Sequence, residues 1–438
     1  MPSRRSKGGL LARVNFPLYT LQMLTSRHIL VGGGGGSSKT GVANGFEIFE
    51  LSHNGTHFIA EEVTRHETGP SVVMNCASHN NGKKTWIVAG QESHCQLYNV
   101  NSKVVTSENG ELIKGPAASI AANKDGLRHR KNSEKVTEEV QSLKERTEEI
   151  KDRDDNSNVK CKKLQLILKP ADSVQTAFGD GEPLQRIVRV SLHGKIMATG
   201  GTDGKVKLWK FPQLHKLYDL DAHGNEIDDI DFSPDSSLLV SIAKDGKAFL
   251  WNVKDGTKDK ELTWIPSNGA KYVYKRCRFR KLLEDRTRTD LFMLSNAVMA
   301  KNPSYLQLWD VQTGAIVKSA SYKETLSALA VSDNGHFVAV GTMFSGSVDI
   351  FVAFNLRKAL HVPGAHSMFV TGLEFLPTSL DGPAITSNTE TAVVSISVDN
   401  RICIHSIPFR HTLPFWFVII LIVICICGAF VLCSYLGI

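Results

Sequence analysis

The chain has 438 residues, of which 42% are hydrophobic and 22% are charged, and its formal net charge is +7. It is too long for one ordinary small domain, although folds built from repeats reach this size as a single unit. The modest positive charge permits a weak attraction to anionic membranes or nucleic acid, but it identifies neither partner.

The eight cysteines form no CxxC pair and no Cys/His cluster with zinc spacing, which excludes the common structural zinc sites. The basic start of the chain, Met1–Lys7, is not followed by an apolar stretch, so no signal peptide is expected. Free thiols without a signal peptide favour a reducing, cytosolic location for most of the chain.

The most unusual local feature is the loop Gly32–Gly45, with the sequence GGGGGSSKTGVANG, between the expected strands Ile29–Val31 and Phe46–Leu51. Consecutive glycines let the main chain adopt conformations that are closed to other residues. Their carbonyls can then converge on a hard cation or approach a partner closely. In that case Lys39 and Asn44 are the side chains available to touch the partner.

The same loop partly matches a phosphate-binding P-loop, G-x-x-x-x-G-K-[ST], because Lys39-Thr40 supplies its last two positions. Ser38 stands where the second glycine belongs. A P-loop must also run into a helix whose N-terminus faces the phosphates, whereas Phe46–Phe49 alternates as a strand. A recognition loop is therefore preferred to nucleotide binding, and a simple flexible loop stays open as the alternative.

The second copy of a repeated unit is Trp86–Tyr98, in which a short apolar strand is followed by turn residues and an alternating strand. Two charged segments depart from this repeat. Lys124–Lys163 is dense in charges that nearly cancel and has no aromatic residue, which predicts a solvated or partly helical insertion in the second unit. Tyr272–Arg288 is more basic and is interpreted as an exposed strand face and loop, with a binding patch as the alternative.

The clearest copies of the unit are Met197–Trp209 and Val240–Trp251. Their terminal tryptophans are 42 residues apart, a spacing that is typical of WD repeats. Asp203-Gly204 and Asp245-Gly246 are expected to form tight turns between the strands of these copies.

Within these copies, apolar residues alternate with the lysines Lys205 and Lys207, so we expect the apolar side chains to point inward and the lysines outward. His223, Asp245 and Trp251 occupy the positions where WD repeats build a hydrogen-bonded network of side chains. We prefer this structural role for His223 to a catalytic one.

A third copy ends at Tyr305–Asp310. Weaker copies span Val338–Phe351, Val393–His405 and Ile29–Phe49, which with Trp86–Tyr98 brings the number of units to seven. The last unit has no obvious fourth strand, and Leu10–Val14 is expected to supply it and to close the ring. Closure by both ends of the chain removes free sheet edges that would otherwise aggregate. The sequence therefore predicts an all-β, seven-bladed WD40-like β-propeller over residues 1–412.

The segment Leu413–Ile438 contains no charged side chain and is longer than the roughly 20 residues that cross a bilayer. Trp416 and Tyr435 lie near its ends, where aromatic rings favour the membrane interface. Arg410 flanks its N-terminal side and nothing basic follows, which places the propeller in the cytosol. A buried core helix is the alternative, but such helices rarely run this long without a polar residue. A tail anchor in the endoplasmic reticulum membrane is expected.

Two stretches near the N-terminus carry a family resemblance. Phe16-Pro17-Leu18-Tyr19, followed by the glycine-rich loop and then by Gly90–Leu97 (GQESHCQL), is similar to the prolactin regulatory element-binding protein family. These proteins are the animal form of the endoplasmic reticulum exchange factor for the small GTPase that starts COPII coat assembly. The resemblance covers the whole chain, but its specific motif is the loop, because the blades are generic.

The resemblance implies that the loop coordinates a potassium ion through its carbonyls and presses on the switch regions of the GTPase. Displacement of magnesium and of phosphate contacts would let GDP leave and GTP replace it, with no covalent chemistry. Asn44 matches the closing asparagine of the loop and is assigned a contact, whereas Lys39 and Thr40 match without an assigned role. The expected contact residues are Gly32, Gly33, Gly34, Gly35, Gly36, Ser37, Ser38, Lys39, Thr40, Gly41 and Asn44.

Two other functions stay open at this point. A DNA-binding transcription regulator is suggested by the family's name and by the net positive charge, but the chain has no helix-turn-helix or zinc-finger pattern and no long basic run. A membrane-anchored scaffold without exchange activity is the default function of a propeller, because a fold does not imply a function.

Overall fold

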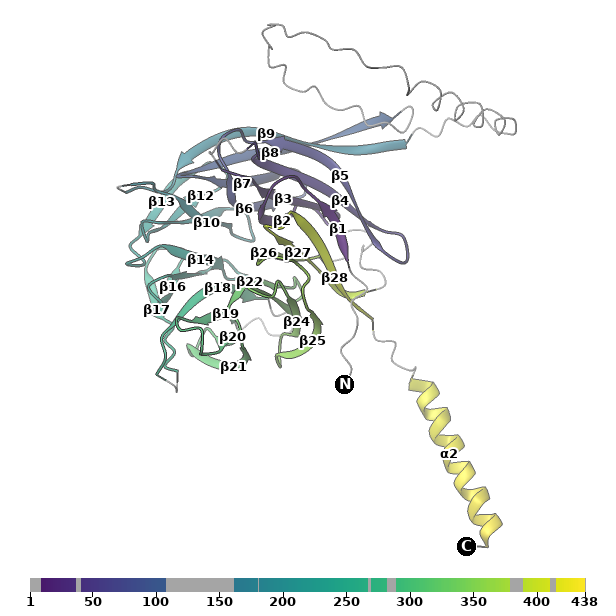
Figure 1. Ribbon diagram of the computed structural model, residues 1–438. Coiled ribbons are helices and arrows are strands. Elements are labelled where there is room, and N and C mark those ends of the chain that lie inside the picture. The colour runs from purple at the N-terminus through teal and green to yellow at the C-terminus, as the bar shows by residue number, and fades with distance from the viewer. Residues whose placement is uncertain are drawn as a thin grey trace, which may run out of the picture. The chain divides into compact units, whose positions relative to one another are not determined.

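The computed structural model describes residues 9–36, 41–107, 161–179, 181–266, 269–281, 289–378, 389–409 and 415–437. Its strands form seven four-stranded antiparallel sheets, as the sequence predicts (Figure 1). The chain divides into a large unit, residues 1–101 and 166–438, and a small unit, residues 102–165. The charged insertion expected at Lys124–Lys163 falls outside the described residues, apart from the start of the strand at Cys161.

Each sheet is one blade, and its strands follow one another in the sequence except in the last blade. Blades 1 to 3 consist of β2 (Leu18–Met23), β3 (His28–Gly33), β4 (Gly45–His53) and β5 (Phe58–Glu67); β6 (Val73–Asn80), β7 (Thr85–Gln91), β8 (His94–Ser107) and β9 (Cys161–Gln175); and β10 (Gln185–Val190), β11 (Ile196–Gly201), β12 (Val206–Lys210) and β13 (His215–Leu220).

The remaining blades repeat this arrangement. Blades 4 to 7 consist of β14 (Ile227–Phe232), β15 (Leu238–Ala243), β16 (Ala248–Asn252) and β17 (Lys258–Glu261); β18 (Tyr272–Arg280), β19 (Asp290–Ala297), β20 (Ser304–Asp310) and β21 (Ala315–Tyr322); β22 (Leu326–Val331), β23 (Phe337–Thr342), β24 (Val348–Val352) and β25 (Arg357–Val362); and β26 (Val370–Phe375), β27 (Thr389–Ser397), β28 (Arg401–Pro408) and β1 (Leu10–Arg13).

The first strands of neighbouring blades contact one another all the way round, from β2 through β26 and back to β2, so these strands form the inner wall of the ring (Figure 1). The ring is closed by β1, which pairs with β28 through Leu10 opposite Cys403 and Arg13 opposite Arg401. The predicted closure by both ends of the chain is therefore confirmed. It pairs an edge of β28 that would otherwise be open.

The antiparallel strands place the connections on two opposite faces of the ring. On one face lie the β3–β4 loop, its equivalents and the links between blades, joined by bonds such as Thr68 N–H to Asn44 O. We call it the loop face. On the other lie the first-to-second and third-to-fourth strand connections, joined by bonds such as Leu51 N–H to Arg27 O. We call it the anchor face, because β28 ends there at Pro408, ahead of the C-terminal helix.

The helix α2 (Phe415–Leu436) forms in the apolar C-terminal segment. Its residues Trp416–Leu436 have a mean hydropathy of 3.1, and none of this stretch is buried against the protein. Among the described residues, it is the one helix long and apolar enough to cross a membrane. The alternative of a buried core helix is wrong.

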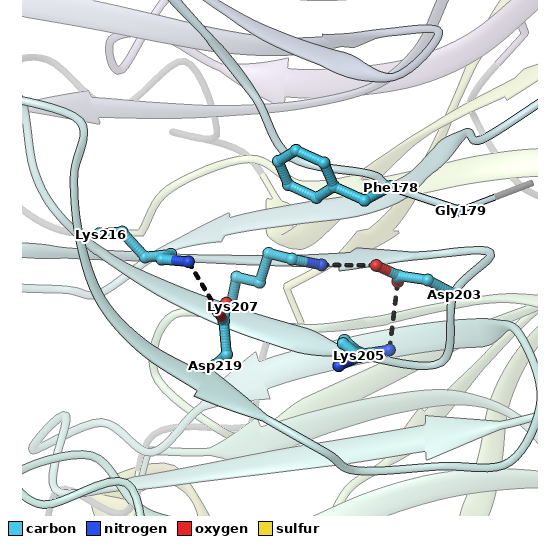
Figure 2. Close-up of a pocket in the computed structure, with 7 residues that line it drawn as sticks. All are labelled: Phe178, Gly179, Asp203, Lys205, Lys207, Lys216 and Asp219. Atoms are coloured by element: carbon cyan, nitrogen blue, oxygen red, sulfur yellow. Dashed lines mark hydrogen bonds and ion pairs between the residues drawn. The ribbon is translucent and has the colours of Figure 1, made fainter.

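The prediction that Lys207 points outward is wrong. Its side chain is 3% exposed, and its Nζ lies 2.6 Å from Asp203 Oδ2 (Figure 2). In a propeller, both faces of an inner or middle strand pack against neighbouring blades, so alternation along the strand does not assign one face to solvent. Lys205 does reach outward and pairs with Asp221 at 2.9 Å.

The basic segment Tyr272–Arg288 also differs from its prediction. Residues 272–280 form β18 on the inner wall, and their cations meet carboxylates of β14 and β19. Lys275 pairs with Asp228 at 2.8 Å, and Arg278 with Asp229 at 2.6 Å. These side chains therefore form neither an exposed strand face nor a binding patch. Residues 282–288 lie outside the described part of the chain.

Candidate functional site at the glycine-rich loop

The glycine-rich loop starts inside the sheet rather than after it. Gly32 and Gly33 belong to β3, where they pair with Phe46 and Gly45 of β4. The described irregular part covers residues 34–36 and 41–44, and the predicted contact residues Ser37, Ser38, Lys39 and Thr40 lie outside the described residues. The loop is the β3–β4 connection of blade 1 on the loop face.

The glycines of the loop serve two different purposes. A Cβ at Gly33 would lie 1.9 Å from the Pro17 carbonyl oxygen, and one at Gly34 would lie 2.1 Å from Asn44 Oδ1. These two positions allow close packing that no side chain fits. At Gly36, by contrast, nothing lies within 4 Å of a Cβ, but φ is +86°, a value that glycine adopts without strain. The loop is thus packed tightly where it leaves β3 and is open farther out.

Asn44 closes the base of the loop. Its Oδ1 accepts the Gly36 N–H at 2.9 Å, and its Nδ2 donates to Gly36 O at 3.0 Å, which joins the two ends of the loop. The same Nδ2 lies 3.0 Å from Gly69 O and 3.1 Å from Pro70 O in the connection between blades 1 and 2. Because Asn44 is 5% exposed, the expected contact by its side chain is corrected to a positioning role.

The Phe16–Tyr19 motif holds the loop from the other side. The Gly34 N–H donates to the Pro17 carbonyl at 3.1 Å, while Phe16 and Leu18 are buried in the core of blade 1. The motif that carries the family resemblance therefore fixes the first residue after β3. Neither this contact nor those of Gly69 and Pro70 was predicted, although the Gly69-Pro70 pair is a turn signal in the sequence.

The floor beneath the loop is aromatic. Phe46 and His66 both pack edge-on against Tyr98 of blade 2, with ring centroids 5.5 and 5.4 Å apart. Burial lowers the pKa of His66, which keeps its ring neutral near pH 7. Beside it, Arg65 pairs with the buried Glu47, which opposes the rise in the Glu47 pKa that burial causes. The two ring contacts join blade 1 to blade 2 below the loop, and the ion pair joins β4 to β5 within blade 1.

The second motif, Gly90–Leu97, forms the β7–β8 turn on the loop face of blade 2. The Glu92 carbonyl accepts the Gln185 N–H at 2.7 Å, and Cys95 is fully buried. Burial raises the pKa of the Cys95 thiol to about 12, so it is not a reactive thiolate at neutral pH. The motif is thus a structural turn in the blade next to the loop.

The predicted network around His223 is confirmed and includes a serine that sequence reasoning missed. His223 Nδ1 lies 3.1 Å from Asp245 Oδ2 and its Nε2 lies 2.9 Å from Ser241 Oγ. The Trp251 indole donates to the same Oγ at 2.9 Å. The order Ser–His–Asp suggests a nucleophile, but Ser241 is fully buried and already bonded by two partners. Its role is structural.

Comparisons with known proteins agree with this architecture. A model of the WD domain, G-beta repeat, matches residues 185–210 and 214–252, which lie in blades 3 and 4. The guanine nucleotide-exchange factor SEC12 of Mus musculus is 32% identical over 434 residues, covering 96% of this chain and 95% of that protein. The SEC12 of Rattus norvegicus is 31% identical over the same length.

A more distant relative, SEC12-like protein 1 of Arabidopsis thaliana, is 28% identical over 202 residues, which cover 44% of this chain. The match to the mouse protein is different in extent, because it covers 96% of this chain. The resemblance carried by the N-terminal motifs is thereby confirmed. This chain belongs to the SEC12 family of guanine nucleotide-exchange factors, which promote nucleotide release from a partner and perform no covalent chemistry.

Proposed function

We propose that this protein loads GTP onto the small GTPase that initiates the COPII coat, at the endoplasmic reticulum membrane, and that the loop Gly32–Asn44 is the element that acts on the GTPase. The observation that carries the proposal is the full-length match to a SEC12 exchange factor combined with a glycine-rich loop braced at both ends. The membrane helix supports the location, because it holds the propeller at a bilayer.

The bracing supports a mechanical role for the loop. An exchange factor works by binding the nucleotide-free GTPase better than the GDP-bound form, so it must pay for displaced magnesium and phosphate contacts in the switch regions. A loop that moved freely would lose conformational entropy when it bound the GTPase, so less binding free energy would remain to displace the switch regions. Asn44 and Pro17 fix the base of the loop at Gly34 and Gly36 before the GTPase arrives, which leaves that binding energy available to open the nucleotide site.

We propose that a potassium ion completes the loop. The expected ligands are backbone carbonyls of residues 33–44, because carbonyl oxygens are ligands that potassium sites use. The carbonyl oxygens of Gly36, Gly69 and Pro70 face the Asn44 amide nitrogen, which occupies the point on which they converge, so the ion would use other carbonyls of the loop. No cluster of three or more His, Cys, Asp or Glu that could hold a metal occurs among the described residues. A bound potassium ion would supply positive charge that holds backbone carbonyls together and stiffens the loop.

The test is nucleotide-exchange kinetics with the full chain reconstituted in liposomes, using the coat GTPase loaded with fluorescent GDP. We expect the protein to accelerate GDP release, and replacement of residues 33–44 by a short Asn-Gly turn to abolish the acceleration. The matched control replaces residues 298–303, the equivalent β19–β20 connection of blade 5, and should leave the rate unchanged. Normal release with the shortened blade 1 loop would contradict the proposal.

The potassium proposal has its own test in the same assay. Release is measured in potassium and in sodium salts at equal ionic strength. We expect the native loop to work faster in potassium, and the protein with the shortened loop to show no difference between the two salts. Equal rates for the native loop in both salts would reject the ion and leave the exchange activity standing.

A further inference from the structure

On the anchor face, the described loops of blades 1 to 3 carry basic residues and no acidic ones. In blades 1 to 3, its described loops and the end of β12 expose Lys83, Lys84, Lys195 and Lys210 and also carry the half-buried Arg27. Those loops, residues 24–27, 54–57, 81–84, 191–195 and 211–214, contain no acidic residue. None of the five basic side chains forms an ion pair within the described part of the chain. Within the described residues, no ion pair therefore neutralises these side chains; residues 108–160, which link β8 to β9, lie outside the described part of the chain.

The same face of blades 4 to 6 is different. Its described loops carry Lys254 and Lys281, but they also carry Asp235, Asp255 and Asp333. Among the described loops, basic residues without acidic ones beside them are thus confined to the sector of blades 1 to 3. This sector adjoins blade 7, from which the C-terminal helix departs, because the inner strands β2 and β26 are in contact.

An exposed leucine stands inside the basic sector. Leu192 is 64% exposed at the tip of the β10–β11 loop, three residues before Lys195. The loop is held firmly: the Lys195 carbonyl accepts the Phe211 N–H at 2.8 Å, and a Cβ at Gly194 would lie 2.0 Å from His79 Nε2. His79 is next to the last residue of β6, so the Leu192 loop lies against the strand that leads into Lys83 and Lys84. We call Lys83, Lys84, Leu192, Lys195 and Lys210 the basic patch.

The chain keeps this face close to the bilayer. β28 ends at Pro408 on the anchor face, and α2 begins at Phe415. The six residues between them span at most about 25 Å when fully extended. β1 begins at the same face with Leu10, and the sequence before it, Met1–Gly8, contains three basic residues and no acidic one.

We propose that the basic patch binds the anionic headgroups of the membrane that α2 spans, so that the propeller has a second attachment to the lipid surface. Lysines near a negatively charged leaflet are attracted within a Debye length, and an apolar side chain between them enters the headgroup region. The short linker makes this contact intramolecular, which raises its effective concentration. Docking through this patch turns the loop face, and the glycine-rich loop with it, away from the bilayer.

The test measures amide hydrogen exchange of the full chain in nanodiscs of phosphatidylcholine, with or without phosphatidylserine. We expect amide hydrogen exchange in residues 81–84 and 191–195 to slow by about fivefold with the anionic lipid, which is the gain in binding expected from one basic side chain at such a surface. High salt should remove the protection. Residues 244–247, on the loop face of blade 4, serve as the internal reference.

Charge reversal separates lipid binding from other causes of protection. Lys83→Glu combined with Lys84→Glu should abolish the slowing, and Leu192→Asp should reduce it. The matched control, Lys247→Glu with Lys271→Glu, makes the same charge change on the loop face and should leave the slowing of amide exchange unchanged. All these side chains are exposed, so folding is retained. Equal exchange in the two lipids, or protection that survives reversal of Lys83 and Lys84, would overturn the proposal.

Discussion

At the scale of single residues, Asn44 holds the loop through an unusual arrangement of donors and acceptors. Its Nδ2 carries two protons but lies 3.0 to 3.1 Å from three carbonyl oxygens, those of Gly36, Gly69 and Pro70. No hydrophobic side chain can satisfy these oxygens. An aspartate would place negative charge against them. The contact between the two ends of the loop at Gly36 and Asn44 therefore depends on one amide.

We predict that Asn44→Ala slows GDP release by about tenfold or more, because the loop loses the bonds that hold its base. The free energy of unfolding should fall by only about 1–3 kcal/mol, the cost of leaving buried carbonyls unpaired. Exchange kinetics and urea unfolding measure the two effects. The control is Asn54→Ala: Asn54 caps the β4–β5 turn of the same blade on the anchor face, and its loss should affect stability alone. Equal slowing in both variants would contradict a specific role for Asn44.

Two glycines of the loop should respond differently to the same substitution. Gly34→Ala places a methyl group 2.1 Å from Asn44 Oδ1 and must displace the base of the loop. Gly36→Ala meets no atom within 4 Å, so its cost is confined to a positive φ, about 1 kcal/mol. We expect Gly34→Ala to abolish accelerated exchange and Gly36→Ala to retain most of it. The opposite order in the exchange assay would show that the outer loop matters more than its base.

At the scale of the blade, blade 7 varies the network of blade 4. His366 bridges Asp399 and Ser395 as His223 bridges Asp245 and Ser241. The place of the Trp251 indole is taken by His405, whose Nε2 lies 2.9 Å from Ser395 Oγ. Burial, with a smaller effect of His366, lowers the pKa of His405 to about 3. Blade 7 thus buries a neutral imidazole where blade 4 has an indole.

This substitution predicts a pH dependence of stability. The unfolded chain protonates His405 near pH 6.5, whereas the folded chain keeps it neutral down to about pH 3, so acid favours unfolding. The contribution of the buried, neutral His405 to the free energy of unfolding is complete above pH 6.5. It is lost as the pH falls, by about 2 kcal/mol at pH 5. The free energy of unfolding in urea is measured at pH 7 and at pH 5, and His405→Phe should reduce the difference between the two pH values by about 2 kcal/mol. His57→Phe alters an exposed turn and should leave this difference unchanged. Equal losses of stability between pH 7 and pH 5 in the two variants would refute the assignment of the pH dependence to His405.

The blades were predictable because their signals are local. Turn residues such as Asp203-Gly204 and the strands beside them lie within a few positions of one another, and the repeat supplies the rest. The side-chain environments were not predictable. Lys207 is buried by packing between blades, and Asn44 by residues 25 and 26 positions farther along the chain. Such contacts depend on how blades stack, which alternation within one strand does not encode.

At the scale of the whole molecule, the propeller separates two functions onto two faces. The glycine-rich loop lies on the loop face of blade 1, and the chain leaves blade 7 for α2 on the anchor face. The ring is closed by β1 and β28, so it needs no support from the helix. If the proposed function is correct, the anchor controls where exchange happens and the loop controls whether it happens.

A change in α2 should therefore alter location and spare exchange. Ile422→Arg combined with Ile426→Arg places two charges at the centre of the span, at a cost of about 6 kcal/mol for insertion. We expect the variant to become extractable from microsomes by carbonate, while Ile422→Leu with Ile426→Leu stays in the membrane.

The extracted arginine variant should still accelerate GDP release in solution, because no part of the α2 span is buried against the ring. Loading of the GTPase on the membrane surface should fall in parallel with the amount of anchored protein. If exchange in solution were lost together with insertion, the helix would be part of the exchange site, and the separation of the two faces would be wrong.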